Sequence, residues 1–290
     1  FPEGCMEGFD ISIRKPDTIP VMDEHRYLPE ASRVSVLTVI ILLAFALAHF
    51  LPLPEGSLSF PILGLVLTIP LNLNTAIALV TAGMTAAGTD WLLRTHPSLQ
   101  KGETREHWLI PTLTVLVLGI TLYTLPGSVW WLGFGLGAFL LVAVFLAEYV
   151  VVDHTDLRYP LATAVITALA FAIFLILAVS LRASGGRLFL IAPALFLGSF
   201  LVALRTLHLR LYERWEPVWA LGIALLGTQI GSALHYFPLT PVRYGLALLA
   251  PLYAVTLLAV SLAEGLPFRR SVIEPVVMAA LFWGLLFWFR

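Results

Sequence analysis

Long apolar blocks separated by short polar segments run along most of this 290-residue chain. Nine such blocks follow a polar stretch over residues 1–32, and several have the roughly 20 residues that a helix needs to cross a hydrocarbon core of about 30 Å. Their approximate bounds are Val34–Leu51, Ile62–Leu93, Leu109–Leu125, Val129–Val152, Leu161–Leu181, Leu188–Leu204, Val218–Phe237, Tyr244–Ala263 and Val272–Phe289. Blocks such as Leu161–Leu181 are apolar on every face of a helix and do not alternate apolar with polar residues, as the strands of a barrel would. The pattern therefore predicts an all-α integral membrane bundle of about nine transmembrane helices, and not a barrel.

The second block, Ile62–Leu93, is too long for one crossing, because a straight helix of that length would extend about 48 Å. Proline, glycine and asparagine interrupt its first part, and Asn72 or Asn74 can cap a helix that begins there. We expect the spanning helix over residues 73–93. We expect residues 58–72, which are rich in β-forming side chains around Gly64, to form an extended hairpin or a re-entrant segment at the outer face.

The basic residues fall mainly on one side of the membrane that these blocks imply. Thirteen of the 17 lie in segments that are cytoplasmic if the N-terminus is cytoplasmic. The four on the other side are Arg182, Arg187, Arg243 and Arg290. Since basic loop residues resist translocation, the skew predicts a cytoplasmic N-terminus and an external C-terminus. If residues 58–72 crossed the membrane by themselves, every later loop would change sides and the skew would reverse.

Composition agrees with a membrane protein. Hydrophobic residues make up 59% of the chain and charged residues only 12%, more apolar surface than a soluble domain of this length could cover. A net charge of −1 provides no basic face for nucleic acid, and the single cysteine excludes an internal disulfide. We expect a polar cytoplasmic N-terminal arm over residues 1–32 and a single transmembrane helical domain over 33–290. We expect a prokaryotic plasma membrane, such as a bacterial inner membrane, as its location.

Ionisable side chains gather near the predicted cytoplasmic ends of the helices. This candidate inner polar layer consists of Asp90, Glu148, Asp153, Asp156, Arg205, Arg210, Glu264 and Glu274. Charges within a membrane are costly and often mark functional sites. One interpretation is a set of interhelical ion pairs and interfacial anchors. The other is a cytoplasmic polar cavity in which arginines bind an anionic head group. Gln229 lies well inside a predicted helix, where we expect it to hydrogen-bond to another helix.

Catalytic motifs are weak in this sequence. Asp153 and Asp156 have the D-x-x-D spacing with which membrane prenyltransferases hold Mg²⁺ and a diphosphate. Those enzymes need a second aspartate-rich loop, which this chain lacks. In addition, Tyr159-Pro160 comes shortly after Asp156, just before the fifth predicted helix. A short charged turn explains the spacing better. His49 and His235 are predicted at similar depth, but their spacing does not require haem. We therefore assign no catalytic residue, no metal and no cofactor.

Three classes of function remain. A non-catalytic accessory or scaffolding subunit of a membrane assembly is favoured, because few polar groups are buried. A transporter or lipid-handling protein with the cytoplasmic head-group site is the alternative, and Pro193 and Pro251 inside predicted helices are consistent with it. A membrane enzyme that acts on a lipid phosphate is the third.

We expect membrane lipids as partners. Small-residue faces are compatible with a protein partner or a homo-oligomer, although ordinary packing within the bundle explains them better. These faces are formed by Gly133 with Gly137 and by Gly227 with Gly231.

Overall fold

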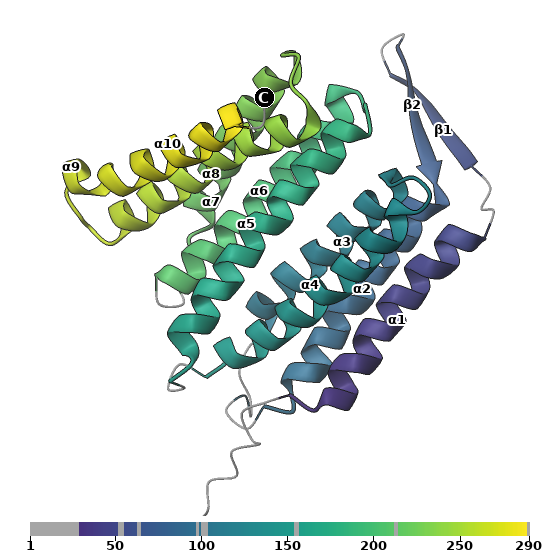
Figure 1. The fold of residues 1–290 in the computed structure, drawn as a ribbon, viewed down its shortest axis with the longest axis horizontal. Coiled ribbons are helices and arrows are strands. Elements are labelled where there is room, and N and C mark those ends of the chain that lie inside the picture. The colour runs from purple at the N-terminus through teal and green to yellow at the C-terminus, as the bar shows by residue number, and fades with distance from the viewer. Residues whose placement is uncertain are drawn as a thin grey trace, which may run out of the picture.

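The computed structural model describes residues 29–51, 55–62, 65–96, 99, 104–153, 157–211 and 214–288. Helices account for most of them (Figure 1). The first half contains α1 (Ala31–Phe50), β1 (Glu55–Ile62), β2 (Leu65–Asn72), α2 (Leu73–Leu93), the short 3-10 helix η3 (Arg105–Trp108), α3 (Leu109–Thr124) and α4 (Val129–Val151). The second half contains α5 (Tyr159–Ala183), α6 (Leu188–Arg210), α7 (Pro217–His235), α8 (Pro241–Ala263), α9 (Phe268–Ser271) and α10 (Ile273–Trp288).

Eight of the described helices, α1 to α8, are long and apolar enough to cross a membrane. The last of the nine expected blocks, Val272–Phe289, corresponds to α10, and the short α9 lies just before this block. α10 has 16 residues; this corresponds to about 24 Å of helix, less than a hydrocarbon core of about 30 Å. Pro275 gives a physical reason why α9 and α10 are separate helices. It has no backbone N–H, and its ring clashes with the carbonyl of Ser271, where α9 ends.

The over-long second block divides as the sequence predicts. α2 begins at Leu73 and ends at Leu93, and the segment before it is an antiparallel hairpin with Glu55 opposite Asn72. The extended interpretation of residues 58–72 is thus confirmed, although β1 starts earlier, at Glu55. Within the described ranges, these two strands form the only sheet. The hairpin projects beyond the ends of α1 and α2 (Figure 1).

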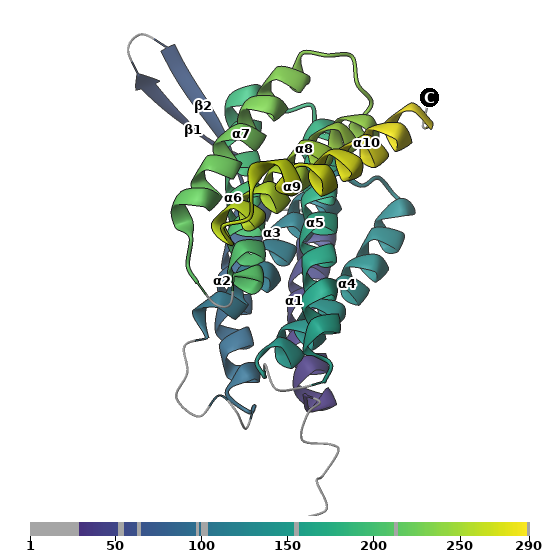
Figure 2. The ribbon, with the colours of Figure 1, turned by 90° about the vertical axis from the view of Figure 1, so that its left-hand side faces the viewer.

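The two ends of the bundle differ in charge. The connections after α2, α4, α6 and α8 lie at one end, called here the basic end because it carries Arg94, Arg158, Arg214 and Arg269. The hairpin and the turns after α3, α5 and α7 lie at the other, the hairpin end (Figures 1 and 2). This separation is what the arginine skew requires. Which end faces the cytoplasm stays a prediction.

The helices form two groups that meet along α3, α4 and α5. In one, α1 to α4 pack around buried side chains such as Ile41 and Phe145. In the other, α5 to α8 pack around Phe174 and Leu248. α10 lies against α8 at the edge farthest from α1 (Figure 1). α6 and α8 continue as helices through their internal prolines, so neither forms the broken helix expected of some transporters.

The small-residue faces are occupied by helix packing within the chain. A Cβ added to Gly137 would lie 2.6 Å from a methyl of Leu118, and one added to Gly231 would lie 2.8 Å from a methyl of Leu195. Gly133 and Gly227 also face neighbouring helices of the same chain. These glycines therefore allow close packing inside the bundle. A protein partner or homo-oligomer stays a prediction and needs a different surface.

Candidate functional site

A buried group of ionisable side chains joins the two helix groups at the basic end. We call it the basic-end cluster; its members are Glu106 and His107 of η3, Glu148 of α4, and Arg205 and His208 of α6. Arg205 donates from Nη2 to Oε2 of Glu148 at 2.5 Å and from Nε to Oε1 at 3.3 Å. His107 Nδ1 lies 2.7 Å from the same Oε2. Because a carboxylate paired with arginine only accepts hydrogen bonds, this ring nitrogen carries the proton.

Glu106 completes the cluster on its other side. Its carboxylate oxygens lie 3.5 Å from His107 Nε2 and 3.4 Å from His208 Nε2. The cavity among these side chains has a volume of about 10 Å³, which is room for about one water. Within the described part of the chain, no group of three or more His, Cys, Asp or Glu side chains could hold a metal ion. The guanidinium of Arg205 is already paired with Glu148. The small cavity leaves no room for a head group, although Nδ1 of His208 is buried without a hydrogen-bond partner.

Among the described members of the predicted inner polar layer, Glu148 and Arg205 are joined directly. Asp90 bonds instead to Arg94 Nε at 2.7 Å and accepts from Thr104 Oγ1 at 2.5 Å. Arg210, Glu264 and Glu274 are exposed, and Asp153 is half-buried just after α4. Asp156 lies outside the described residues. The described members do not share one buried layer, because Arg210, Glu264 and Glu274 are exposed.

Gln229 also differs from expectation. Its side chain is exposed on α7, on the outside of the bundle, and within the described residues it makes no hydrogen bond to another helix. Helical periodicity explains the correction. Gly227 and Gly231 face neighbouring helices, and a residue midway between them is turned by about 200° from each, toward the opposite side.

Sequence reasoning missed Glu106, His107 and His208. His208 is three residues after Arg205, so both lie on one face of α6, and this spacing could have indicated the pairing. Glu106 and His107 carry no comparable signal, because they belong to a connecting segment whose path only the tertiary structure sets.

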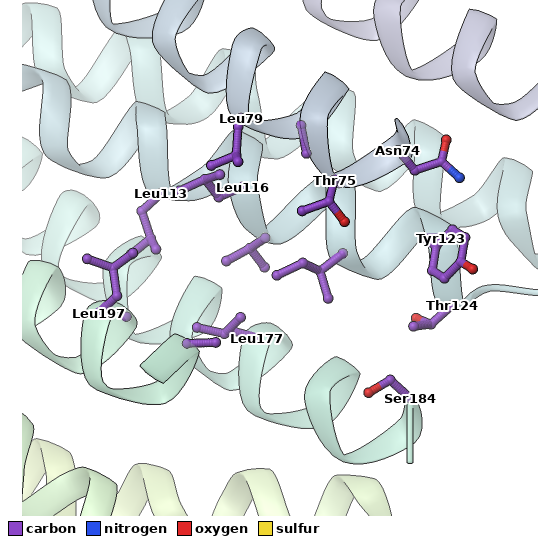
Figure 3. A pocket seen from close by; sticks show the side chains of 16 residues that line it. Asn74, Thr75, Leu79, Leu113, Leu116, Tyr123, Thr124, Leu177, Ser184 and Leu197 are labelled. Atoms are coloured by element: carbon purple, nitrogen blue, oxygen red, sulfur yellow. The ribbon is translucent and has the colours of Figure 1, made fainter. Parts of the chain in front are cut away.

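A larger cavity lies between the two helix groups toward the hairpin end (Figure 3). We call it the hairpin-end cavity; its volume is about 310 Å³, and α2, α3, α5 and α6 contribute to its walls. Leucines form most of its inner part, among them Leu113, Leu177 and Leu197. On α3 the lining runs from Leu113 to Thr124, a distance of about 16 Å along the helix.

The mouth of the hairpin-end cavity is polar but uncharged. Asn74, Thr75, Tyr123, Thr124 and Ser184 gather there (Figure 3). Neither Asp, Glu, Lys nor Arg is among the residues that line the cavity. This arrangement matches an amphiphile with an apolar tail and a neutral head.

A second cavity adjoins the mouth. It has a volume of about 290 Å³, shares Asn74 and Tyr123 with the first, and is also lined by His49 and Trp130. The His49 ring stacks on Trp130 with 4.2 Å between centroids. Asn74 Oδ1 is buried at the junction and has no hydrogen-bond partner. An unsatisfied acceptor at the meeting point of two cavities is a place where a ligand donor would fit.

Residues 53–289 match the model of a family described as "Protein of unknown function (DUF5656)". The chain belongs to this family. The matched region runs from the hairpin through α10, so it contains the whole basic-end cluster and the walls of the hairpin-end cavity. No curated protein matches the chain, and no solved structure matches it.

Proposed function

We propose that this chain is a lipid-handling membrane protein. It takes the hydrocarbon chain of a single-chain amphiphile into the hairpin-end cavity and holds the neutral polar head of that amphiphile at Asn74. The observation that carries the proposal is the buried, unpartnered Oδ1 of Asn74 at the polar mouth of an apolar cavity.

The dimensions and lining of the cavity support one hydrocarbon chain. Its volume of about 310 Å³ is at the lower end of the range of about 300–1,000 Å³ that is usual for small-molecule sites. Lipid tails are as apolar as leucine, so moving a chain from the bilayer onto these leucines brings little hydrophobic gain. Selectivity then depends on the polar mouth.

The mouth favours a neutral head group that can donate a hydrogen bond. An unsatisfied buried acceptor costs about 1–3 kcal/mol, and a hydroxyl or amide donor from the ligand would relieve that cost at Asn74. A charged head would need an opposite charge nearby. The cavity lining contains no Asp, Glu, Lys or Arg.

This proposal moves the lipid site away from the end that the arginines indicated. At the basic end, Arg205 is paired with Glu148 inside a buried cluster, so its geometry favours a structural role. With the N-terminus cytoplasmic, as the charge skew predicts, the hairpin-end cavity opens toward the outer leaflet of the membrane.

Photolabelling in lipid nanodiscs tests the proposal. The probe is a monoacylglycerol with a photoreactive diazirine in its acyl chain, competed with the unlabelled lipid. We expect labelled peptides from α3 and α6. Asn74→Leu removes the acceptor and should lower labelling about 2- to 10-fold, as expected for one hydrogen bond. Ala194→Phe places a ring in the cavity and should abolish labelling.

The matched control is Ala87→Phe, the same substitution in an apolar groove between α1 and α2. This variant should be photolabelled to the same extent as the unmodified chain. Labelling that persists in Ala194→Phe, or that is spread evenly over all lipid-facing helices, would contradict the proposal and return the accessory-subunit function to first place.

A further inference from the structure

An amide side chain faces outward from the middle of α7. Gln229 is exposed, and it is six residues from the end of the helix at His235, or about 9 Å along the axis. In the described parts of the eight candidate spans, no other charged or amide side chain is exposed more than one turn from a helix end. Gln229 is therefore the polar exception on the lipid-facing surface.

Hydrocarbon cannot satisfy this side chain. An amide has two donor hydrogens and one acceptor oxygen, and moving it from water to a medium without hydrogen-bonding groups costs several kcal/mol. No group in the described part of the chain forms a hydrogen bond to it. The free energy of the inserted protein is therefore lowered by any partner that brings both a donor and an acceptor to this depth.

The surroundings of Gln229 have the pattern of a helix-packing face. Val218, Gly222, Leu225 and Gln229 are exposed on α7, and Tyr236 is exposed just after its end. Their spacings of three, four or seven residues are those of the seam of a parallel helix pair. We call these residues the α7 face. A Cβ added to Gly222 would meet nothing within 4 Å, so another helix could approach the backbone there. No residue of the α7 face carries a charge.

We propose that the α7 face is an interface between two copies of this chain. Both copies insert in the same orientation, so two α7 helices related by a twofold axis along the membrane normal run parallel. Gln229 then meets Gln229 at equal depth. Each amide donates to the other and accepts from it, a self-complementary pairing that twofold symmetry provides. A different subunit would need its own polar side chain at this depth.

Disulfide crosslinking in native membranes tests the contact. The chain has a single cysteine, Cys5, so Cys5→Ser provides the background. Leu225→Cys on the α7 face should form a dimer on mild oxidation. The matched control, Leu136→Cys, is on an equally exposed face of α4 and should not.

Energy transfer between labelled copies in lipid vesicles then measures the strength of pairing. Gln229→Leu should weaken pairing by about 3- to 30-fold, as expected for interhelical hydrogen bonds in a membrane. Gln229→Asn should retain most of it. Neither change should alter thermal stability in detergent, because the side chain points away from the bundle.

Three results would overturn the proposal. The first is a monomer at every protein-to-lipid ratio. The second is equal crosslinking at Leu225 and Leu136, or pairing of Gln229→Leu as strong as that of the unmodified chain. The third is a different subunit held at the α7 face in place of a second copy.

Discussion

Replacing Arg205 by methionine removes the guanidinium from the basic-end cluster and leaves the carboxylate of Glu148 behind. Glu148 is 0% exposed and Arg205 is 1% exposed, so bulk water cannot take the place of the lost partner. Methionine keeps the length and apolar stem of the side chain. The variant therefore tests the charge and the two hydrogen bonds, and not the packing.

The structure sets the size of the expected loss of stability. Breaking a buried ion pair by removing one partner costs about 3–5 kcal/mol, because an uncompensated charge stays buried. His107 keeps its hydrogen bond to Glu148 at 2.7 Å, so we expect the lower end, about 3 kcal/mol. For soluble chains of 150–250 residues, each kcal/mol corresponds to about 2–4 °C. The apparent midpoint of thermal unfolding should therefore fall by roughly 6–12 °C.

Thermal unfolding of the purified chain in a mild detergent measures this effect. Arg210→Met is the matched control, because it makes the same change one turn further along α6 at an exposed side chain. Such surface changes usually stay within about 0.5 kcal/mol. The double variant Arg205→Met with Glu148→Met removes both charges and should regain most of the lost stability, because apolar pairs of similar volume often replace buried ion pairs without loss.

Two results would refute this reasoning. If Arg205→Met is no less stable than Arg210→Met, the cluster does not hold the helix groups together. If the double variant is as unstable as the sum of its two single variants, the loss comes from packing and not from the unpaired charge.

Further predictions concern packing and topology. Gly245→Ala should lower stability by about 1–3 kcal/mol, since its Cβ would lie 2.7 Å from a methyl of Val179. Gly135→Ala in α4 meets nothing within 4 Å and should be neutral or stabilising in the same thermal assay. Tyr244→Phe removes a buried hydrogen bond of 3.0 Å to the carbonyl of Gly231 and should cost about 1 kcal/mol. A tag after α10 should be accessible only from outside intact cells if α10 completes a ninth span, and only after permeabilisation if it does not.

Most of the fold could be predicted from the order of the residues. A bilayer requires each spanning segment to satisfy its own backbone hydrogen bonds, so segment length and apolarity are enough to locate α1 to α8. The division of the second block into a hairpin and α2 followed from Asn72, Asn74 and the preceding proline. Within the described residues, the ninth block also coincides with one helix, α10.

The candidate sites were only partly predictable. The sequence placed Glu148 and Arg205 at similar depth, because depth along a spanning helix depends only on position within it. It could not indicate that Glu106 and His107 complete the cluster, nor that Arg210 points outward. Those outcomes depend on which helices are neighbours and on how each is rotated about its axis.

The amino-acid sequence by itself determined the helical class of the protein, the bounds of most of its long apolar helices, and the separation of basic residues toward one end, because these properties depend on local apolarity and charge. Only the tertiary structure decided where the bundle is closed and where it is open. Side chains from η3, α4 and α6 close the basic end, while α2, α3, α5 and α6 leave a cavity with Asn74 at its mouth. Such contacts join residues far apart in the chain and depend on packing, which no local pattern encodes.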